Sequence, residues 1–200
     1  MLNIGVLISG SGSNLQSLID ACALDDFPVN IKVVICNKHD AYGIQRAKDA
    51  GIETVCISHK DYSDREAFDR QMHHVLEDRE VEFVCLAGFM RLLSPWFAQQ
   101  WHNKMVNIHP SLLPSFKGIN AQQQALDYGV KIAGCTLHFV RSEMDTGPII
   151  LQAAVEVKSD DTFETLRDRI LEQEHRIYVQ GLKMIASGQV KVDGDQLVYQ

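Results

Sequence analysis

Apolar runs of strand length alternate with helical patterns over the first 109 residues, and this alternation constrains the possible folds more than any other feature. The expected strands are residues 2–9, 31–36, 53–57, 83–88 and 105–109. Strands that alternate with helices pair in parallel through right-handed crossovers, so helices cover both faces of the sheet. The predicted class is α/β, with three layers, a mostly parallel central sheet and a Rossmann-like N-terminal half.

The pattern changes after His109. The expected elements are a loop at 110–119, a helix at 121–128, strands at 131–140 and 149–155, a helix at 162–186 and a hairpin turned at Asp193-Gly194. The two strands are joined by a short acidic turn, which predicts antiparallel additions to the sheet in the C-terminal half. We therefore expect a single domain, 1–200, with a phosphate-binding half (1–109) and a half that carries much of the chemistry and a closing helix (110–200).

Two helix starts have recognisable caps. Ser63 and Glu66 have the spacing of a capping box and predict the start of a long helix. Ser94 followed by Pro95 predicts a second helix that runs to about His102.

A glycine-rich loop, Gly10-Ser11-Gly12-Ser13-Asn14, lies between the first strand and the first helix. Unpaired backbone N–H groups at a helix N-terminus form an anion site. A dinucleotide fingerprint would need glycine where Leu15 stands and an acidic residue where Asn37 stands. The loop also lacks the ending of a Walker A motif. It is typical of a single phosphate site, with Ser13 and Asn14 as added donors; the alternative is a glycine turn capped by Asn14.

Asn107 and His109 lie two residues apart on the fifth expected strand, so their side chains share one face. Pro110 ends that strand and leaves His109 at its carboxyl end, where open α/β sheets bind ligands. Asp145, in the acidic turn, could orient the histidine. An amide, an imidazole and a carboxylate suit a reaction in which an oxyanion forms and a proton moves. The alternative is a histidine and an asparagine that satisfy a buried loop.

Three other sets of residues are candidates that are weaker alone. Met90, Arg91, Leu92 and Leu93 follow the fourth strand, where a flat ligand could be held; the alternative for Phe89, Met90, Leu92 and Leu93 is core packing. Arg65 lies in the first turn of its helix, and Glu174 lies inside the long C-terminal helix; a solvated face is the ordinary explanation of both. His138 lies on a strand and could be a satisfied core histidine.

Composition excludes several partners. The net charge of −7 and a pI near 5.6, without a run of Lys or Arg, disfavour nucleic-acid and membrane partners. The N-terminus leads directly into a strand and no apolar stretch is of transmembrane length, so cytoplasmic residence is expected. Five cysteines without a C-x-x-C pair are typical of buried thiols, although Cys85 and Cys135 near strand ends leave a nucleophile open. The histidines form no metal signature, so no metal is expected.

Taken together, these motifs resemble the phosphoribosylglycinamide formyltransferase family over essentially the full length. The segments that carry the resemblance are residues 8–15, 87–91, 107–118, 137–140, 145–149 and 173–175. The resemblance implies the formyltransferase fold, with Asn107, His109 and Asp145 as the catalytic group. It implies ribonucleotide contacts at Gly12, Ser13, Asn14 and Glu174. It also implies formylfolate contacts at Arg65, Met90, Arg91, Leu92, Leu93 and Asn107.

The implied reaction transfers a formyl group from 10-formyltetrahydrofolate, the co-substrate, to glycinamide ribonucleotide, with both substrates small molecules and the enzyme a monomer or homodimer. The chemistry requires neither a metal nor a covalent enzyme intermediate. The stretch 119–122 lacks histidines that some family members carry, which leaves that loop's contacts open.

Three alternatives remain. A methionyl-tRNA formyltransferase would be expected to carry an additional C-terminal domain and a basic surface for tRNA, and a formyltetrahydrofolate hydrolase an N-terminal regulatory domain. The third is a binding module without turnover, against which the presence of all three catalytic candidates argues.

Overall fold

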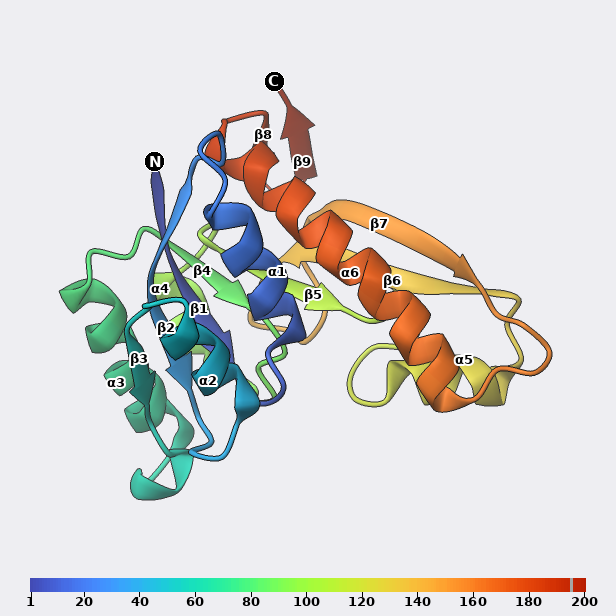
Figure 1. The fold of residues 1–200 in the computed structure, drawn as a ribbon, viewed down its shortest axis with the longest axis horizontal. Coiled ribbons are helices and arrows are strands. Elements are labelled where there is room, and N and C mark those ends of the chain that lie inside the picture. Colours follow the sequence, from blue (N-terminus) through green and yellow to red (C-terminus); the bar gives the residue numbers. More distant parts are fainter. Residues whose placement is uncertain (195) are drawn as a thin grey trace.

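A central sheet runs through both halves of the chain, as the computed structural model of residues 1–194 and 196–200 shows (Figure 1). The described residues form seven sheet strands in the order β3-β2-β1-β4-β5-β6-β7. The strands are β1 (Leu2–Ile8), β2 (Val29–Cys36), β3 (Thr54–Cys56), β4 (Phe83–Leu86), β5 (Met105–His109), β6 (Ile132–Phe139) and β7 (Ile149–Glu156). The neighbours in the series β3, β2, β1, β4 and β5 pair in parallel, whereas β5 with β6 and β6 with β7 pair antiparallel. This confirms the predicted fold class.

Helices cover both faces of this sheet, as the alternation of strands and helices predicted. They are α1 (Ser13–Cys22), α2 (Tyr42–Asp49), α3 (Arg65–Asp78), α4 (Pro95–Gln100), α5 (Ala121–Tyr128) and α6 (Phe163–Ala186), with a short 3-10 helix, η1, at His59–Asp61. Alternate residues of β1 point to opposite faces: Val6 packs in the cluster that holds α1 and α6, and Leu7 in the cluster that holds α3 and α4. None of the helices in the described part of the chain combines the length and apolarity needed to cross a membrane.

The C-terminal segment follows α6 as a separate two-stranded hairpin, β8 (Val190–Asp193) and β9 (Gln196–Tyr199). It confirms the hairpin expected around Asp193-Gly194. The contact between α6 and the sheet is reinforced by Tyr178, whose buried hydroxyl donates to the Leu86 carbonyl at the end of β4, 3.0 Å away. The closing helix is thus tied to the strand edge where ligands are expected.

Three local predictions about helix ends were wrong. The N-cap of α3 is Asp64 and not Ser63, because the Asp64 carboxylate accepts from the Ala67 amide at 2.8 Å and engages the Ser63 hydroxyl as well. The helix expected to reach His102 ends at Gln100. The alternative role of Asn14 as a helix cap is also wrong, because Gly12 is the N-cap of α1.

The strand order places the candidate residues at one edge. Successive strands lie on one side of β1 as far as β3, and the chain then crosses to the other side for β4 and β5. A crevice at such a switch point, beyond the carboxyl ends of the strands, is where open α/β sheets bind ligands. The glycine loop follows β1, residues 87–94 follow β4, and His109 ends β5, so the three candidate segments lie at the same edge of the sheet.

Candidate active site

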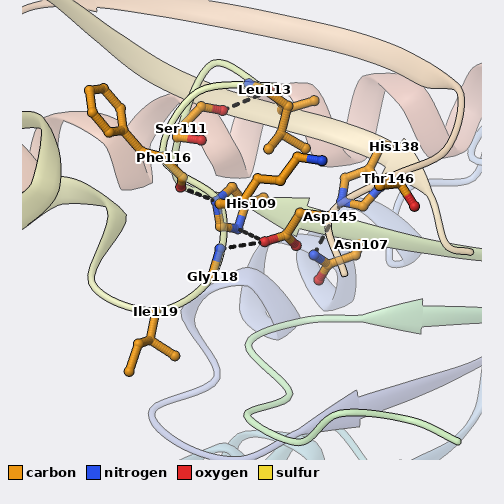
Figure 2. A network of polar contacts seen from close by, with 12 residues as sticks. Asn107, His109, Ser111, Leu113, Phe116, Gly118, Ile119, His138, Asp145 and Thr146 are labelled. Atoms are coloured by element: carbon orange, nitrogen blue, oxygen red, sulfur yellow. Dashed lines mark hydrogen bonds and ion pairs between the residues drawn. The ribbon is translucent and has the colours of Figure 1, made fainter. Parts of the chain in front are cut away.

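His109 is a buried residue whose two ring nitrogens both face oxygen atoms (Figure 2). Nε2 lies 2.9 Å from the Phe116 carbonyl oxygen, and Nδ1 lies 3.5 Å from Oδ2 of Asp145. A carbonyl oxygen and a carboxylate accept hydrogen bonds and donate none, so an N–H on either ring nitrogen would point at an acceptor. The ring of His109 is therefore held between two hydrogen-bond acceptors.

Asp145 lies in the turn between β6 and β7, and this turn is shaped to present its carboxylate. Its φ of 51° is in the left-handed region, and Gly147 follows with a φ of 112°. A Cβ on Gly147 would come within 2.3 Å of the Phe139 carbonyl oxygen, so only glycine fits there. Oδ2 of Asp145 also accepts from the Gly118 amide at 2.7 Å. The predicted proximity of His109 and Asp145 is confirmed.

Asn107 is held by the neighbouring strand. Its amide nitrogen lies 3.4 Å from Nε2 of His138, its cross-strand partner on β6. Burial lowers the pKa of His138, and its Nδ1 lies 2.9 Å from the Phe139 carbonyl, so Nδ1 carries the proton and Nε2 accepts. This neutral histidine turns the Asn107 amide and leaves its second N–H for another acceptor. His138 therefore orients an active-site residue as well as filling the core.

A buried polar network shapes the loop that brings the Phe116 carbonyl to His109. Thr136 on β6 donates through Oγ1 to the Ser111 carbonyl at 2.7 Å and accepts from the Leu113 amide at 3.0 Å. Gln152 on β7 donates to the Leu113 carbonyl and to Thr136, each at 3.0 Å. The antiparallel strands thus determine where residues 110–116 lie. Sequence reasoning missed both side chains, because a threonine and a glutamine within strands give no distinct signal.

The glycine loop supplies the second part of the site. Gly12 has a φ of 70° and precedes the first turn of α1, whose N-terminal amides have no side-chain cap and can bind an anion. Asn14 donates through Nδ2 to Oε2 of Glu174 on α6 at 2.7 Å, and both side chains are buried. Burial raises the pKa of Glu174 to about 7. The solvated-face explanation of Glu174 is therefore wrong, because α6 directs it into the interior beside the glycine loop.

We predict that Gly12→Ala destabilises the fold as well as the loop. A Cβ at Gly12 would lie 2.7 Å from the Cα of Gly43 on α2, and its φ is one that alanine rarely adopts. The expected loss of stability is about 1–3 kcal/mol, measured by chemical denaturation. Gly51→Ala is the matched control, since Gly51 has the same φ of 70° with open space around its Cβ position. An equal loss in both variants would show that the contact with α2 contributes nothing.

The segment after β4 presents apolar side chains to solvent. Met90 is 70% exposed and Leu92 is 53% exposed, whereas Phe89 is buried. Core packing, the alternative considered for this segment, is therefore wrong for Met90 and Leu92. Arg91 in the same segment and Arg65 at the start of α3 are both exposed. Exposed apolar groups beside two cations suit a flat ligand that carries negative charge.

Other chemistry is disfavoured at this edge of the sheet. Burial raises the pKa of the Cys85 and Cys135 thiols to about 12, so neither is poised as a thiolate nucleophile. Among residues 1–194 and 196–200, no three His, Cys, Asp or Glu side chains are grouped to hold a metal ion.

A hollow beside Asp145 is lined by Arg141, Ser142, Glu143, Thr146 and Gly147.

The chain is similar to known formyl transferases in sequence and in fold. A family model described as formyl transferase matches residues 2–182. The chain is 43% identical over 191 residues to phosphoribosylglycinamide formyltransferase of Escherichia coli (strain K12), covering 96% of this chain and 90% of that protein. The crystal structure of glycinamide ribonucleotide transformylase 1 from Symbiobacterium toebii superimposes with a TM-score of 0.97 at 48% identity, covering 100% of this chain and 94% of that one.

The chain also resembles one part of a larger protein. It is 52% identical over 189 residues to the trifunctional purine biosynthetic protein adenosine-3 of Bos taurus. That alignment covers 94% of this chain and 19% of the bovine protein, so the chain spans about a fifth of that relative's length.

Proposed function

The chain belongs to the formyl transferase family, and on that basis we propose that it transfers the formyl group of 10-formyltetrahydrofolate to the glycyl amine of glycinamide ribonucleotide. The products are formylglycinamide ribonucleotide and tetrahydrofolate, and the reaction belongs to de novo purine biosynthesis. The observation that carries the proposal is the joining of Asn107, His109 and Asp145 at the carboxyl end of β5.

The three side chains suit direct transfer through a tetrahedral intermediate. The amine nitrogen attacks the formyl carbon, and the electron pair of the carbonyl moves to oxygen. Protonated His109 and the free N–H of Asn107 stabilise that oxyanion. Asp145 holds His109 protonated and orders a water that takes the proton from the attacking amine. The tetrahedral carbon then expels N10 of the folate, which gains a proton, so the formyl carbon changes partner without an enzyme-bound intermediate.

The contact between His109 and the Phe116 carbonyl has a role in this scheme. Nε2 is engaged by that carbonyl at 2.9 Å, so an oxyanion that binds His109 takes the place of the carbonyl as acceptor. The loop of residues 110–119 therefore holds the ring until substrate arrives. This arrangement preorganises the donor, because the imidazole changes its partner and keeps its orientation.

The two substrates occupy neighbouring subsites. The phosphate of the ribonucleotide lies on the amides of Gly12, Ser13 and Asn14, and Glu174 accepts from its ribose hydroxyls. The formylfolate lies along Met90, Arg91, Leu92 and Leu93, with Arg65 and Asn107 as further contacts. The exposed apolar side chains, the buried Asn14–Glu174 pair and the free helix terminus support this division.

A two-substrate assay tests the proposal. We expect tetrahydrofolate to form from 10-formyltetrahydrofolate only when glycinamide ribonucleotide is present, with formylglycinamide ribonucleotide in equal amount. Tetrahydrofolate formed without the ribonucleotide would identify a hydrolase. Binding of both ligands without product would identify a binding module, and transfer to an aminoacylated tRNA would identify the tRNA-directed alternative. Each of these three results contradicts the proposal.

We predict that Met90→Asp weakens formylfolate binding about tenfold while ribonucleotide binding changes little. Met90 is 70% exposed, so a carboxylate there should change the stability of the fold little. Binding of the aromatic ring of the folate would remove water from that carboxylate, which is unfavourable. Separate titrations of the two ligands measure the effect. Leu24→Asp, at a residue 60% exposed beyond α1, is the matched control. A drop in ribonucleotide affinity alone would show that the two subsites are exchanged.

The proposal also covers the location, oligomeric state, domain organisation and partners of the enzyme. We infer a cytoplasmic enzyme, active as a monomer or homodimer, with one domain over residues 1–200 and small molecules as its substrates. The net charge of −7 supports the absence of a nucleic-acid partner.

A further inference from the structure

Residues 88–94, which lie within the segment between β4 and α4, need support from outside the segment. Met90 and Leu92 are held in solvent although their burial would be favourable. A loop with such side chains tends to collapse onto the nearest apolar surface unless its backbone is fixed. The contacts that fix the backbone therefore decide whether an apolar edge is available to a ligand.

One contact holds the start of this segment. Ser9, the residue after β1, is buried, and its hydroxyl accepts from the Met90 amide at 2.8 Å. The Ser9 amide donates to the Gly88 carbonyl at 3.1 Å. Ser9 thus binds the backbone on both sides of Phe89, and it directly precedes the glycine loop.

A second contact holds the end of the segment. Asp69 on α3 is fully buried, and its Oδ2 accepts from the Ser94 amide at 2.5 Å. Ser94 in turn caps α4, since its hydroxyl accepts from the Phe97 amide at 3.2 Å. Residues 90–93 therefore lie between two anchoring contacts, one from the Ser9 hydroxyl after β1 and one from the Asp69 carboxylate on α3.

The buried carboxyl of Asp69 is energetically unfavourable as a packing group in α3. Its Oδ1 is buried without a hydrogen-bond partner among the described residues. Burial raises the pKa of its carboxyl, while the contact with Ser94 and the charges of Arg65 and Arg91 act in the opposite direction. Replacing a buried charged group by a well-packed apolar side chain of similar volume is often neutral or stabilising. The contribution of Asp69 lies in the backbone amide that it holds, and its carboxyl also interacts electrostatically with Arg65 and Arg91.

We propose that Ser9 and Asp69 are positioning residues for the formylfolate, which hold residues 90–93 in the conformation that exposes Met90 and Leu92 beside Arg65 and Arg91. The inference rests on the proposed function for the identity of the ligand. It assigns a role to two side chains that lie beneath the binding surface, and it explains why that surface stays open before a ligand binds.

Steady-state kinetics of Asp69→Leu and Ser9→Ala test the proposal, with each substrate varied in turn. We expect the KM for 10-formyltetrahydrofolate to rise about tenfold or more in Asp69→Leu and about threefold in Ser9→Ala. The KM for glycinamide ribonucleotide and kcat should stay within about twofold of the parent in both. Asp69→Asn keeps an acceptor for the Ser94 amide and should restore most of the loss, which separates the hydrogen bond from the charge.

Asp161→Leu is the matched control for loss of a poorly exposed carboxylate that holds a backbone amide. Its Oδ2 accepts from the Lys158 amide at 2.8 Å before α6, far along the chain from the crevice. It should lower stability without changing either KM. If Asp161→Leu raises the folate KM as much as Asp69→Leu does, or if Asp69→Leu and Ser9→Ala affect both substrates equally, the positioning role is wrong.

Hydrogen exchange provides a readout that does not depend on turnover. The amides of Met90 and Ser94 should exchange at least about tenfold faster in Ser9→Ala and Asp69→Leu, respectively, while amides in β5 keep the parental rate. Unchanged exchange at residues 88–94 overturns the proposal whatever the kinetics show. Lack of transfer by the parent enzyme would instead overturn the proposed function, and exchange would then decide the positioning role alone.

Discussion

Asp145→Asn is expected to lower turnover by about 10²-fold or more while both substrates still bind. Asparagine keeps the size of the side chain and an oxygen for the Gly118 amide, which lies 2.7 Å from Oδ2. It removes the negative charge that lies 3.5 Å from Nδ1 of His109. Without that charge the imidazolium loses its electrostatic partner, and the oxyanion of the tetrahedral intermediate loses its strongest donor.

Two measurements decide this prediction. Single-turnover rates with saturating substrates isolate the transfer step from binding and product release. Nitrogen chemical shifts of the His109 ring at one fixed pH report how much of the ring is protonated in each protein. Asp127→Asn is the matched control, since the Asp127 carboxylate accepts from Gln123 in an exposed contact on α5. Parental rates together with an unchanged ring spectrum would leave the Asp145 turn as structure alone.

The proximity of Asp145 and His109 was predictable from sequence because strand geometry connects them. His109 ends a strand directly before Pro110, and Asp145 lies in a turn between two strands that were expected as antiparallel additions to the same sheet. Alternation of side chains along β5 then places Asn107 beside His109. In each case a local pattern with a known period determines where a side chain points.

Asp69 and Ser9 could not be predicted in the same way, and Glu174 was predicted only through the family resemblance. A carboxylate in an amphipathic helix has the same sequence signal whether it faces water or the interior, and burial is set by the helix rotation that packing selects. The contacts of Asp69 with Ser94 and of Ser9 with Met90 join residues 25 and 81 positions apart. No periodic signal spans such separations, so these side chains emerge only from the folded arrangement.

Glu174→Gln is expected to stabilise the protein above neutral pH by about 3 kcal/mol and to weaken ribonucleotide binding. Burial raises the pKa of Glu174 from its usual 4.5 to about 7, so folding takes up a proton at pH values between the two. The stability that the protonated carboxyl contributes is complete below about pH 4.5. It is lost as the pH rises through about 7, where the buried group ionises. Glutamine keeps an oxygen for Asn14 and does not titrate.

Denaturation of the parent and of Glu174→Gln from pH 4 to 8.5 measures the effect. The difference in unfolding free energy should be near zero at the acid end, grow through the interval between 4.5 and 7, and level off above it. Glu172→Gln on an exposed face of α6 is the matched control and should give a constant difference. Parallel pH profiles for the parent and Glu174→Gln would show that Glu174 titrates as an ordinary carboxyl.

The ionised Glu174 carboxylate, which lowers the stability of the ligand-free protein, suits the proposed ribonucleotide site. An ionised Glu174 accepts hydrogen bonds through two oxygens, one of which already receives the Asn14 amide at 2.7 Å. A ribose hydroxyl would supply the missing donor and compensate the buried charge, which a neutral glutamine does not require. Stability and substrate affinity should therefore move in opposite directions in Glu174→Gln. A variant that gained stability and bound the ribonucleotide as tightly as the parent would place the ribose away from α6.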